Sequence, residues 1–361
     1  MACALTLGRR FGKLRGIRNN NFDAVRLIAA LTVLVGHAWP LTGQPNPPTL
    51  AGIHVYDLAV YVFFALSGFL ITTSWHREPD ARVYLAKRAL RIFPALVLLV
   101  VLTVFVIGTL ATTAGLSVYF GSPETWRYLA NVSLLVTYDL PGVFAGNPQH
   151  VVNGALWSLG PEFLCYLAVL GLGLLLRRRR LVAACLLAGA FIGVAFVPVQ
   201  PLGEIASAMA FFGVGAVIAA VARGRRLPLL PVVVLIPSWL LASSLLPIDS
   251  QLGQMKLAWL FLPYIVIALG QASTPVVRRL SRFGDISYGM YLWGFLVQQL
   301  VVQVAGVLPL PLDVAVVVIA TAAIGFASWH LVEKRALALK PSATRPIDDA
   351  PPARSPVLQA E

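Results

Sequence analysis

Three ionisable residues lie in one apolar stretch near the N-terminus: Asp23, Arg26 and His37. Arg26 and His37 are eleven positions apart. Eleven helical residues make three turns to within about 20°, so both side chains share one face, ~16 Å apart along the axis. Asp23 precedes Arg26 by three positions and can pair with it. Because ionisable groups inside an apolar span mark functional sites and a histidine can remove a hydroxyl proton, His37 is a candidate general base.

Each of these residues also has a structural interpretation. Arg26 can be an arginine that extends to the membrane surface and is neutralised by Asp23. His37 can be an interfacial histidine whose ring is satisfied by a backbone carbonyl group. A second charged residue on the same helix face favours the functional interpretation of His37.

A carboxylate appears at a comparable position in a later apolar stretch. Glu162 follows Trp157-Ser158-Leu159-Gly160-Pro161 and lies about a turn and a half into its helix, at a predicted depth similar to that of His37. A carboxylate there can orient and charge an imidazole. The alternative is that Glu162 pairs with another polar group of the bundle, such as Arg26.

Arg88 and Arg91 are three positions apart and precede Phe93-Pro94. Both guanidinium groups can face one way, and their fork of N–H donors suits phosphate oxygens. Orientation of the chain by cytoplasmic positive charge, or binding of lipid phosphates, explains the pair equally well.

Other polar residues are interpreted structurally. Ser67-Gly68 offers a small surface for close helix packing, which we prefer to a serine nucleophile. His54 and Asp57 are interpreted as solvated loop residues. An aromatic belt at the membrane interface accounts for three residues of the ninth span. These are Tyr288, Tyr291 and Trp293.

The composition shows which elements must position these groups. Of 361 residues, 58% are hydrophobic and 12% charged, with a mean hydropathy of +0.80. Soluble domains are about 25% charged, so a water-soluble fold is excluded, and so is disorder of the chain as a whole. Long apolar runs that lack strict alternation predict an all-α polytopic membrane helix bundle.

The apolar runs predict about ten transmembrane helices in a domain that covers residues 22–340. They are Phe22–Leu41, Val55–Trp75, Ile92–Leu116, Leu156–Leu176, Leu181–Val199, Ile205–Val221, Leu229–Leu246, Leu257–Gln271, Ile286–Leu308 and Val314–Val332. Trp126–Leu140 is only ~22 Å long as a helix, short of the ~30 Å hydrocarbon core, and is predicted to be amphipathic or re-entrant at the outer face.

The net charge is +13. Basic clusters lie in residues 1–21 and at 77–91, 177–180, 223–226, 278–282 and 334–340. Ten spans place all of these clusters, and both termini, in the cytoplasm, as the positive-inside rule requires. The positive net charge is therefore explained by membrane orientation, and nucleic-acid binding is not needed to account for it. Residues 1–21 are predicted to form a basic cytoplasmic tail and residues 341–361 a disordered cytoplasmic tail. The three cysteines have no disulfide or metal-ligand pattern.

These motifs together resemble the acyltransferase-3 family of bacterial membrane acyltransferases, over about residues 20–340. The resemblance rests on the Arg26/His37 pair, Phe63-Phe64-Ala65-Leu66-Ser67-Gly68-Phe69, the Arg88/Arg91 pair with Phe93-Pro94, and Trp157-Ser158-Leu159 with Glu162. Ile286-Ser287-Tyr288-Gly289-Met290-Tyr291-Leu292-Trp293 and Val332-Glu333-Lys334 extend it. One departure is Gly294, where many members have a histidine.

The resemblance implies an inner-membrane enzyme that moves an acyl group, often acetyl, from cytoplasmic acyl-CoA to a hydroxyl of an extracytoplasmic carbohydrate. Such acceptors include O-antigen and exopolysaccharide. His37, Glu162, Arg26 and Asp23 are then the candidate catalytic residues. Arg88 and Arg91 are the candidate acyl-CoA ligands, with no tightly bound cofactor and no metal. The rival interpretation is a transporter or flippase without covalent chemistry, in which the same charges line a substrate path.

Overall fold

The computed structural model describes residues 20–199, 201–248, 250–275 and 285–341. The predicted terminal tails, except residues 20–21 and 341, and the basic cluster at 278–282 lie outside the described residues. The described chain is helical apart from its loops and one antiparallel hairpin. In the hairpin, β1 (Thr49–Leu50) pairs with β2 (Ile53–His54), with Leu50 opposite Ile53.

Six helical runs are long and apolar enough to cross a membrane. They are α1 (Phe22–Leu41), α2 (Val55–Arg77), α3 with its continuation (Ala81–Ala111), the 3₁₀ turn η3 and α7 (Gly154–Leu175), α9 (Leu202–Ala222) and α14 with its continuation (Leu310–Ala338). The pair α11 (Gln251–Ala258) and α12 (Leu262–Gln271) is bent by 49° and makes a seventh if counted as one span.

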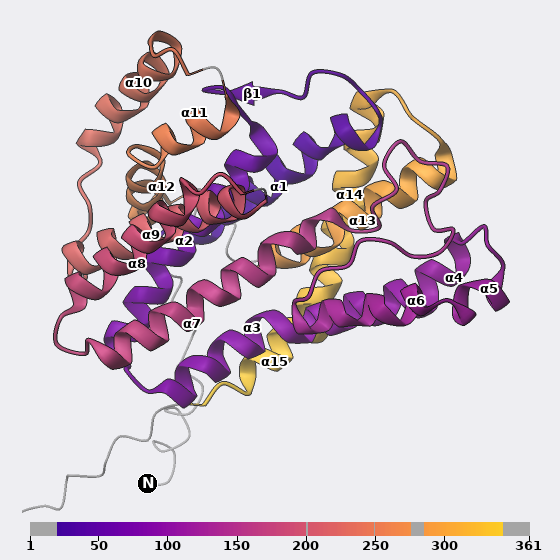
Figure 1. Ribbon diagram of the computed structural model, residues 1–361, viewed down its shortest axis with the longest axis horizontal. Coiled ribbons are helices and arrows are strands. Elements are labelled where there is room, and N and C mark those ends of the chain that lie inside the picture. The colour runs from indigo at the N-terminus through magenta and orange to yellow at the C-terminus, as the bar shows by residue number, and fades with distance from the viewer. Residues whose placement is uncertain (1–19, 200, 249, 276–284, 342–361) are drawn as a thin grey trace, which may run out of the picture.

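Helices also occupy the other predicted spans. These are α8 (Arg180–Ala195), α10 (Leu230–Leu245) and α13 (Ser287–Ala305). The prediction of an all-helical membrane bundle is therefore confirmed, with six or seven candidate spans among the described residues. Figure 1 shows α3, α7 and α13 running obliquely alongside one another beneath α1, α2 and α9.

The third span begins earlier than the sequence predicts. The Asp80 side chain accepts a hydrogen bond of 2.9 Å from the Val83 N–H, which caps the helix and starts it at residue 81. The helix α3 (Ala81–Leu102) then continues through a π-helical turn, η1 (Thr103–Ile107), into α4 (Gly108–Ala111). Most of the basic segment that precedes the predicted third span is therefore helical, and Arg88 and Arg91 project from it one turn apart.

The segment Trp126–Leu140 has no helix of spanning length, as predicted. After α5 (Leu116–Gly121), α6 (Pro123–Arg127) is followed by the 3₁₀ helix η2 (Tyr128–Ser133) and then by irregular chain.

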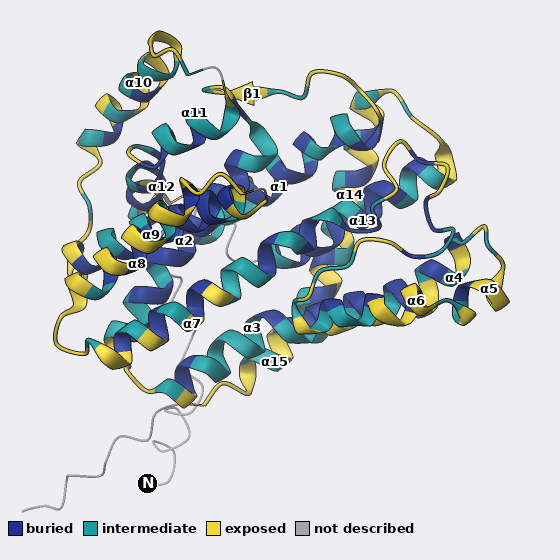
Figure 2. Cartoon of the chain, viewed as in Figure 1, coloured by how far each residue is buried: buried dark blue, intermediate teal, exposed yellow. Residues whose placement is uncertain are grey.

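The core forms where α2 and α9 approach closely. A Cβ added to Gly68 would lie 2.0 Å from the Phe212 carbonyl oxygen, and one added to Gly215 would lie 2.3 Å from that of Ala65. Only glycine allows the two backbones to be this close. The predicted packing role of Ser67-Gly68 is therefore confirmed for the glycine. Figure 2 shows buried residues on the inward surfaces of α2 and α9 and exposed ones on the outer turns of α8 and α10.

Backbone contacts gather several helix termini at one end of the bundle, here called the basic end. The Asn21 N–H donates to the Gly270 carbonyl at 2.8 Å, joining the start of α1 to the end of α12. The Leu227 N–H donates to Gln271 Oε1 at 2.8 Å, which adds the chain after α9. The opposite end, where α1 ends and the β1–β2 hairpin lies, is called the hairpin end.

Candidate functional site

His37 lies in the last turns of α1, toward the hairpin end. Its Nδ1 is 2.8 Å from the Val33 carbonyl oxygen. A carbonyl oxygen only accepts, so Nδ1 carries the proton and, in the neutral ring, Nε2 has the lone pair. The ring packs against Tyr56 (centroids 4.6 Å apart) and edge-on against Phe295 (5.6 Å). The helix backbone thus fixes the tautomer in which Nε2 can accept a proton.

His37 borders a small hollow, here called the His37 cavity, of about 10 Å³ for the centre of a water-sized group. Seven of its nine lining residues are apolar or glycine, from α1, η3 and α13. The lining residues are Ala30, Val33, Leu34, His37, Ala155, Met290, Tyr291, Gly294 and Phe295. Gly294, at the position where many members of the resembled family have a histidine, therefore lies beside His37.

Glu162, in the first turn of α7, is held by two hydroxyl groups. The Ser67 and Tyr166 hydroxyls each donate to Glu162 Oε1 at 2.6 Å. Among the described residues Glu162 makes no hydrogen bond to His37, so this structure does not bring the two predicted residues into direct contact. The reason is that α2 presents Ser67 to Glu162, a contact the sequence does not reveal because it joins positions 95 apart.

Four charged residues from α1, α3, η5 and the chain just before α13 form a largely buried cluster near the basic end, here called the four-charge cluster. Arg26 Nη1 is 3.3 Å and Arg91 Nη2 is 2.7 Å from the same Asp285 Oδ2. Arg91 Nη1 is 3.2 Å from Glu333 Oε2. Two positive and two negative charges cancel, which permits their burial.

Hydroxyl groups complete the hydrogen bonding of both carboxylates. Ser287 Oγ donates to Asp285 Oδ1 at 2.6 Å, and Ser328 Oγ donates to Glu333 Oε1 at 3.0 Å. Glu333 ends a π-helical turn, η5 (Trp329–Glu333), which follows α14 (Leu310–Ser328) and precedes α15 (Lys334–Ala338). Its side chain is 2% exposed.

The cluster corrects the expected partner of Arg26. Asp23 lies in the first turn of α1 as predicted, but the salt bridge of Arg26 is with Asp285, 259 positions away. Sequence reasoning missed Asp285 as a site residue and treated Glu333 only as part of a familiar motif. The available signal was that Asp285 directly precedes one apolar span and Glu333 directly follows another, where an unpaired carboxylate is costly.

A larger cavity, here called the polar cavity, lies between the four-charge cluster and Glu162. It offers about 50 Å³ to the centres of water-sized groups, enough for a few waters. Its lining combines charged, hydroxyl and apolar groups. The lining residues are Arg26, Val60, Phe63, Phe64, Arg91, Ile92, Ser158, Leu159, Glu162, Tyr166, Ser287, Tyr288 and Tyr291. Arg26, Arg91 and Glu162, expected from sequence to be functional, therefore share one cavity.

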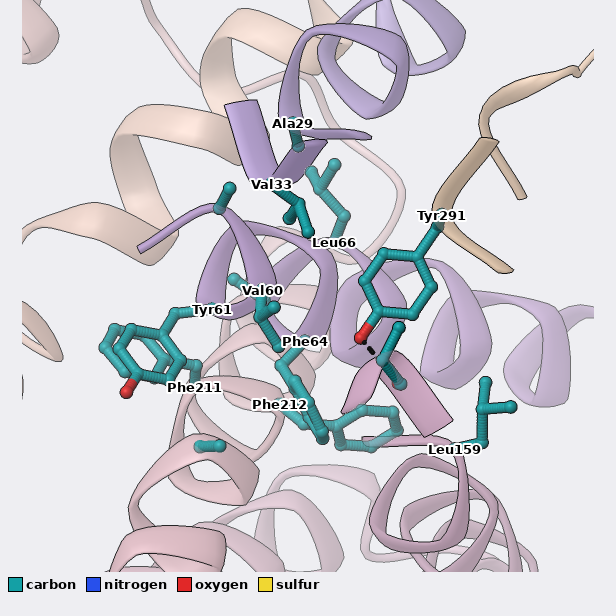
Figure 3. Close-up of a cluster of buried hydrophobic side chains, with 14 of the residues drawn as sticks. Ala29, Val33, Val60, Tyr61, Phe64, Leu66, Leu159, Phe211, Phe212 and Tyr291 are labelled. Carbon is teal, nitrogen blue, oxygen red and sulfur yellow. Dashed lines mark hydrogen bonds between the residues drawn. The ribbon is translucent and has the colours of Figure 1, made fainter. Parts of the chain in front are cut away.

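Tyr291 lines both cavities. Its hydroxyl shares a 2.7 Å hydrogen bond with Ser158 Oγ and lies 3.1 Å from the Ala155 carbonyl oxygen. Figure 3 shows this tyrosine reaching from α13 toward the neighbouring segment, beside the cluster that contains Phe64 and Leu159. Tyr291 and Trp293 are each less than one-tenth exposed, so the interpretation of these aromatic residues as a membrane-interface belt is wrong.

Arg88 differs from Arg91. Its guanidinium carbon lies 5.9 Å from the centre of the Tyr84 ring. Its buried Nε has no hydrogen-bond partner among the described residues. Arg91, in contrast, has both terminal nitrogens in salt bridges. The predicted pair therefore consists of one internally neutralised arginine and one with an available donor.

Asp57 and His54 are not solvated loop residues. Asp57 lies in the first turn of α2, where its Oδ2 accepts a 2.7 Å hydrogen bond from Gln251 Nε2. His54 ends β2 and stacks on Tyr56 at 5.2 Å between ring centres. Tyr56 thus links this group to His37 at the hairpin end.

The arrangement provides an oriented base, a hydrogen-bonded carboxylate and a charged cavity between them and the basic end. In the described part of the chain no group of three or more His, Cys, Asp or Glu residues is placed to hold a metal ion.

Comparisons with known proteins agree with this chemistry. The acyltransferase-3 family profile, described as an acyltransferase domain, matches residues 19–330. An O-acetyl transferase of Shigella phage Sf6 is 31% identical over 346 residues, which cover 89% of this chain and 96% of that protein. Nodulation protein 10 of Rhizobium leguminosarum bv. viciae is 29% identical over 90% of this chain and 94% of its own. No solved structure matches.

Proposed function

Because the chain belongs to the acyltransferase-3 family and is an O-acyltransferase, we propose that it transfers an acyl group from cytoplasmic acyl-CoA to a hydroxyl of an extracytoplasmic carbohydrate. The single observation that carries the proposal is the orientation of His37, whose Nδ1–H is committed to the Val33 carbonyl. This leaves Nε2 free to act as a base beside a cavity. The similarity to a protein named as an O-acetyl transferase supports acetyl as the group transferred.

In the proposed reaction, His37 Nε2 takes the proton of the acceptor hydroxyl as its oxygen attacks the thioester carbonyl carbon. The tetrahedral intermediate collapses by breaking the carbon–sulfur bond, and the departing thiolate of coenzyme A takes the proton back from the imidazolium. The products are the O-acyl carbohydrate and free coenzyme A, and His37 is neutral again.

Three further residues are proposed to assist the reaction from positions between the basic end and His37. They are Glu162, Arg26 and Asp23. Glu162 and Arg26 line the polar cavity, which we propose receives the arm of coenzyme A that carries the thioester. Asp23 lies one turn before Arg26 on α1 and adds negative charge at the entrance beside the arginines.

Arg88 and Arg91 are proposed to bind the phosphates of acyl-CoA at the basic end. Arg88 supports the proposal because its Nε has no hydrogen-bond partner among the described residues and a guanidinium group suits a phosphate. Arg91 contributes positive charge to the proposed phosphate site, and its salt bridges with Asp285 and Glu333 fix its position.

The proposed sidedness follows from ten crossings in the bacterial inner membrane, with both termini in the cytoplasm. In ten crossings the start of α1 and the chain after α9 and α12 lie on the same side of the membrane. The contacts that join these segments at the basic end support that arrangement. A further contact joins the end of α2 to the start of α8, where Arg180 Nη2 donates to the His76 carbonyl at 3.3 Å. Reporter fusions after Arg180 and Arg226 should both report the cytoplasm. A fusion at either site that reports the outside would contradict ten crossings.

The function is tested with the purified full-length chain in lipid nanodiscs, labelled acetyl-CoA and the surface glycan fraction of a deletion strain. The wild type should transfer label to the glycan. His37→Ala and His37→Gln should each lower transfer by about 10²–10⁴-fold, because neither side chain can take and return the proton.

His330 provides a matched control. Its Nδ1 also bonds the carbonyl four residues earlier, that of Phe326, at 3.0 Å, but it lines neither cavity. His330→Gln should keep wild-type transfer. Transfer by His37→Ala at the wild-type rate would refute the base role, and the absence of any acylated product in the wild type would contradict the proposed donor and acceptor.

A further inference from the structure

The His37 cavity is small and lined mainly by apolar groups, and it shares only Tyr291 with the polar cavity. Its volume of about 10 Å³ for a probe centre is that of one water-sized group. Its walls come from Leu34 on α1, Ala155 on η3, and Met290, Gly294 and Phe295 on α13. A methyl group fits such a hollow, whereas a longer chain meets its walls.

The reacting atoms bring the acyl group to this hollow. If Nε2 of His37 holds the acceptor hydroxyl, the attacked carbonyl carbon lies about 3–3.5 Å from that hydroxyl oxygen. The remainder of the acyl group is then within a few bonds of the imidazole. The hollow that the imidazole borders is apolar, so it suits the hydrocarbon end of the acyl group and not its carbonyl oxygen.

We propose that the His37 cavity is the acyl-end pocket of the enzyme and that its walls restrict the donor to acetyl thioesters. This inference rests on the proposed function. It assigns donor chain-length specificity to Leu34 and Phe295, which are not proposed to take part in proton transfer.

Two contacts keep the walls in place. The Phe295 ring is edge-on to His37 at 5.6 Å, and on the side of η3 a Cβ added to Gly154 would lie 2.7 Å from its Cε2 atom. The ring is therefore held between the histidine and the Gly154 backbone. Leu34 closes the cavity against Gly294, where an added Cβ would lie 2.7 Å from Leu34 Cδ1. Neither wall can yield without moving a packed neighbour.

The test is an internal competition. Purified protein in nanodiscs receives equal concentrations of acetyl-CoA and propionyl-CoA with the glycan fraction, and mass spectrometry measures the ratio of propionyl to acetyl product. The ratio does not depend on how much of the protein is active. One methylene in an apolar pocket changes kcat/KM by about 10–200-fold, so the wild type should favour acetyl by at least about 10-fold.

Phe295→Ala and Leu34→Ala each remove a wall and should raise the propionyl-to-acetyl ratio by about 10-fold or more. Leu296→Ala is the matched control, because Leu296 is fully buried on the same helix but does not line the cavity. It should leave the ratio unchanged. Gly294→Ala, which fills the cavity, should lower acetyl transfer without raising the ratio.

The outcomes separate the two proposals. A wild type that transfers acetyl and propionyl equally, or cavity variants with the same ratio as Leu296→Ala, would refute the pocket and leave acyl transfer standing. A wild type that transfers neither group from its thioester would refute the proposed function and the pocket with it.

Discussion

The Arg91–Glu333 contact lets the four-charge cluster be tested by a double-mutant cycle. Glu333→Gln leaves the cluster with a net charge of +1, and Arg91→Gln leaves it at −1, whereas the double variant restores zero. Removing one partner of a buried ion pair costs about 3–5 kcal/mol. Glu333 is 2% exposed but Arg91 is 17% exposed and keeps Asp285, so we expect about 2–3 kcal/mol for Glu333→Gln.

The double variant should be more stable than the sum of the single changes predicts. We expect a coupling of about 1–3 kcal/mol, since each single change leaves an uncompensated buried charge that the double change removes. The assay is SDS-titrated unfolding in mixed micelles, followed by fluorescence of the eight tryptophans.

The Lys87–Glu78 salt bridge is the matched control, with side chains 23% and 31% exposed. The same cycle there should give a coupling below about 1 kcal/mol, because water and salt screen this more exposed pair. If the Arg91 and Glu333 changes are additive within about 0.5 kcal/mol, the electrostatic account of the cluster is refuted.

Two further predictions concern the donor and the core. Arg88→Gln should raise the dissociation constant of acyl-CoA by about 10–100-fold, as expected for a lost hydrogen bond to a charged phosphate. Replacement of the exposed Arg82 should change this constant little. Equal effects of the two replacements would mean that Arg88 contributes only general positive charge. Gly68→Val should prevent accumulation of folded protein in the membrane, because its Cβ would lie 2.0 Å from the Phe212 carbonyl oxygen. Gly171→Val has no neighbour within 4 Å at that position and should accumulate normally; equal abundance of the two variants would contradict the close α2–α9 packing.

Local features of the site could be predicted from the sequence, and long-range partners could not. Helical periodicity correctly places Arg26 and His37 on one apolar helix, because it depends on a single repeat. The partner of Arg26 depends on how helices pack, and the relevant carboxylate, Asp285, is 259 positions away. Apolar composition also fails to distinguish lipid-facing from buried aromatic residues, so the sequence predicts an interface position for Tyr291 and the structure buries it.

Helix boundaries show the same limit. The run of basic residues before Ile92 resembles a loop by composition, yet Asp80 caps a helix that contains it. Charged residues are compatible with that helix because Arg91 finds two carboxylates within the bundle. The extent of α3 therefore depends on partners in the chain before α13 and in η5, which a local sequence window does not include.

The π-helical turn that ends in Glu333 has a consequence for how this chain tolerates changes in length. A π turn accommodates one residue more than an α turn, and one residue corresponds to about 100° of rotation. Deleting a single residue from Trp329–Val332 would close the turn to α-helical geometry and rotate either Glu333 away from Arg91 or the preceding face of α14 away from α13. The charge balance of the bundle interior thus depends on the residue count of this turn as well as on its acidic side chain. A shortened chain that retained every charged residue would therefore either leave Arg91 with Asp285 as its remaining partner in the cluster or misalign α14 with α13.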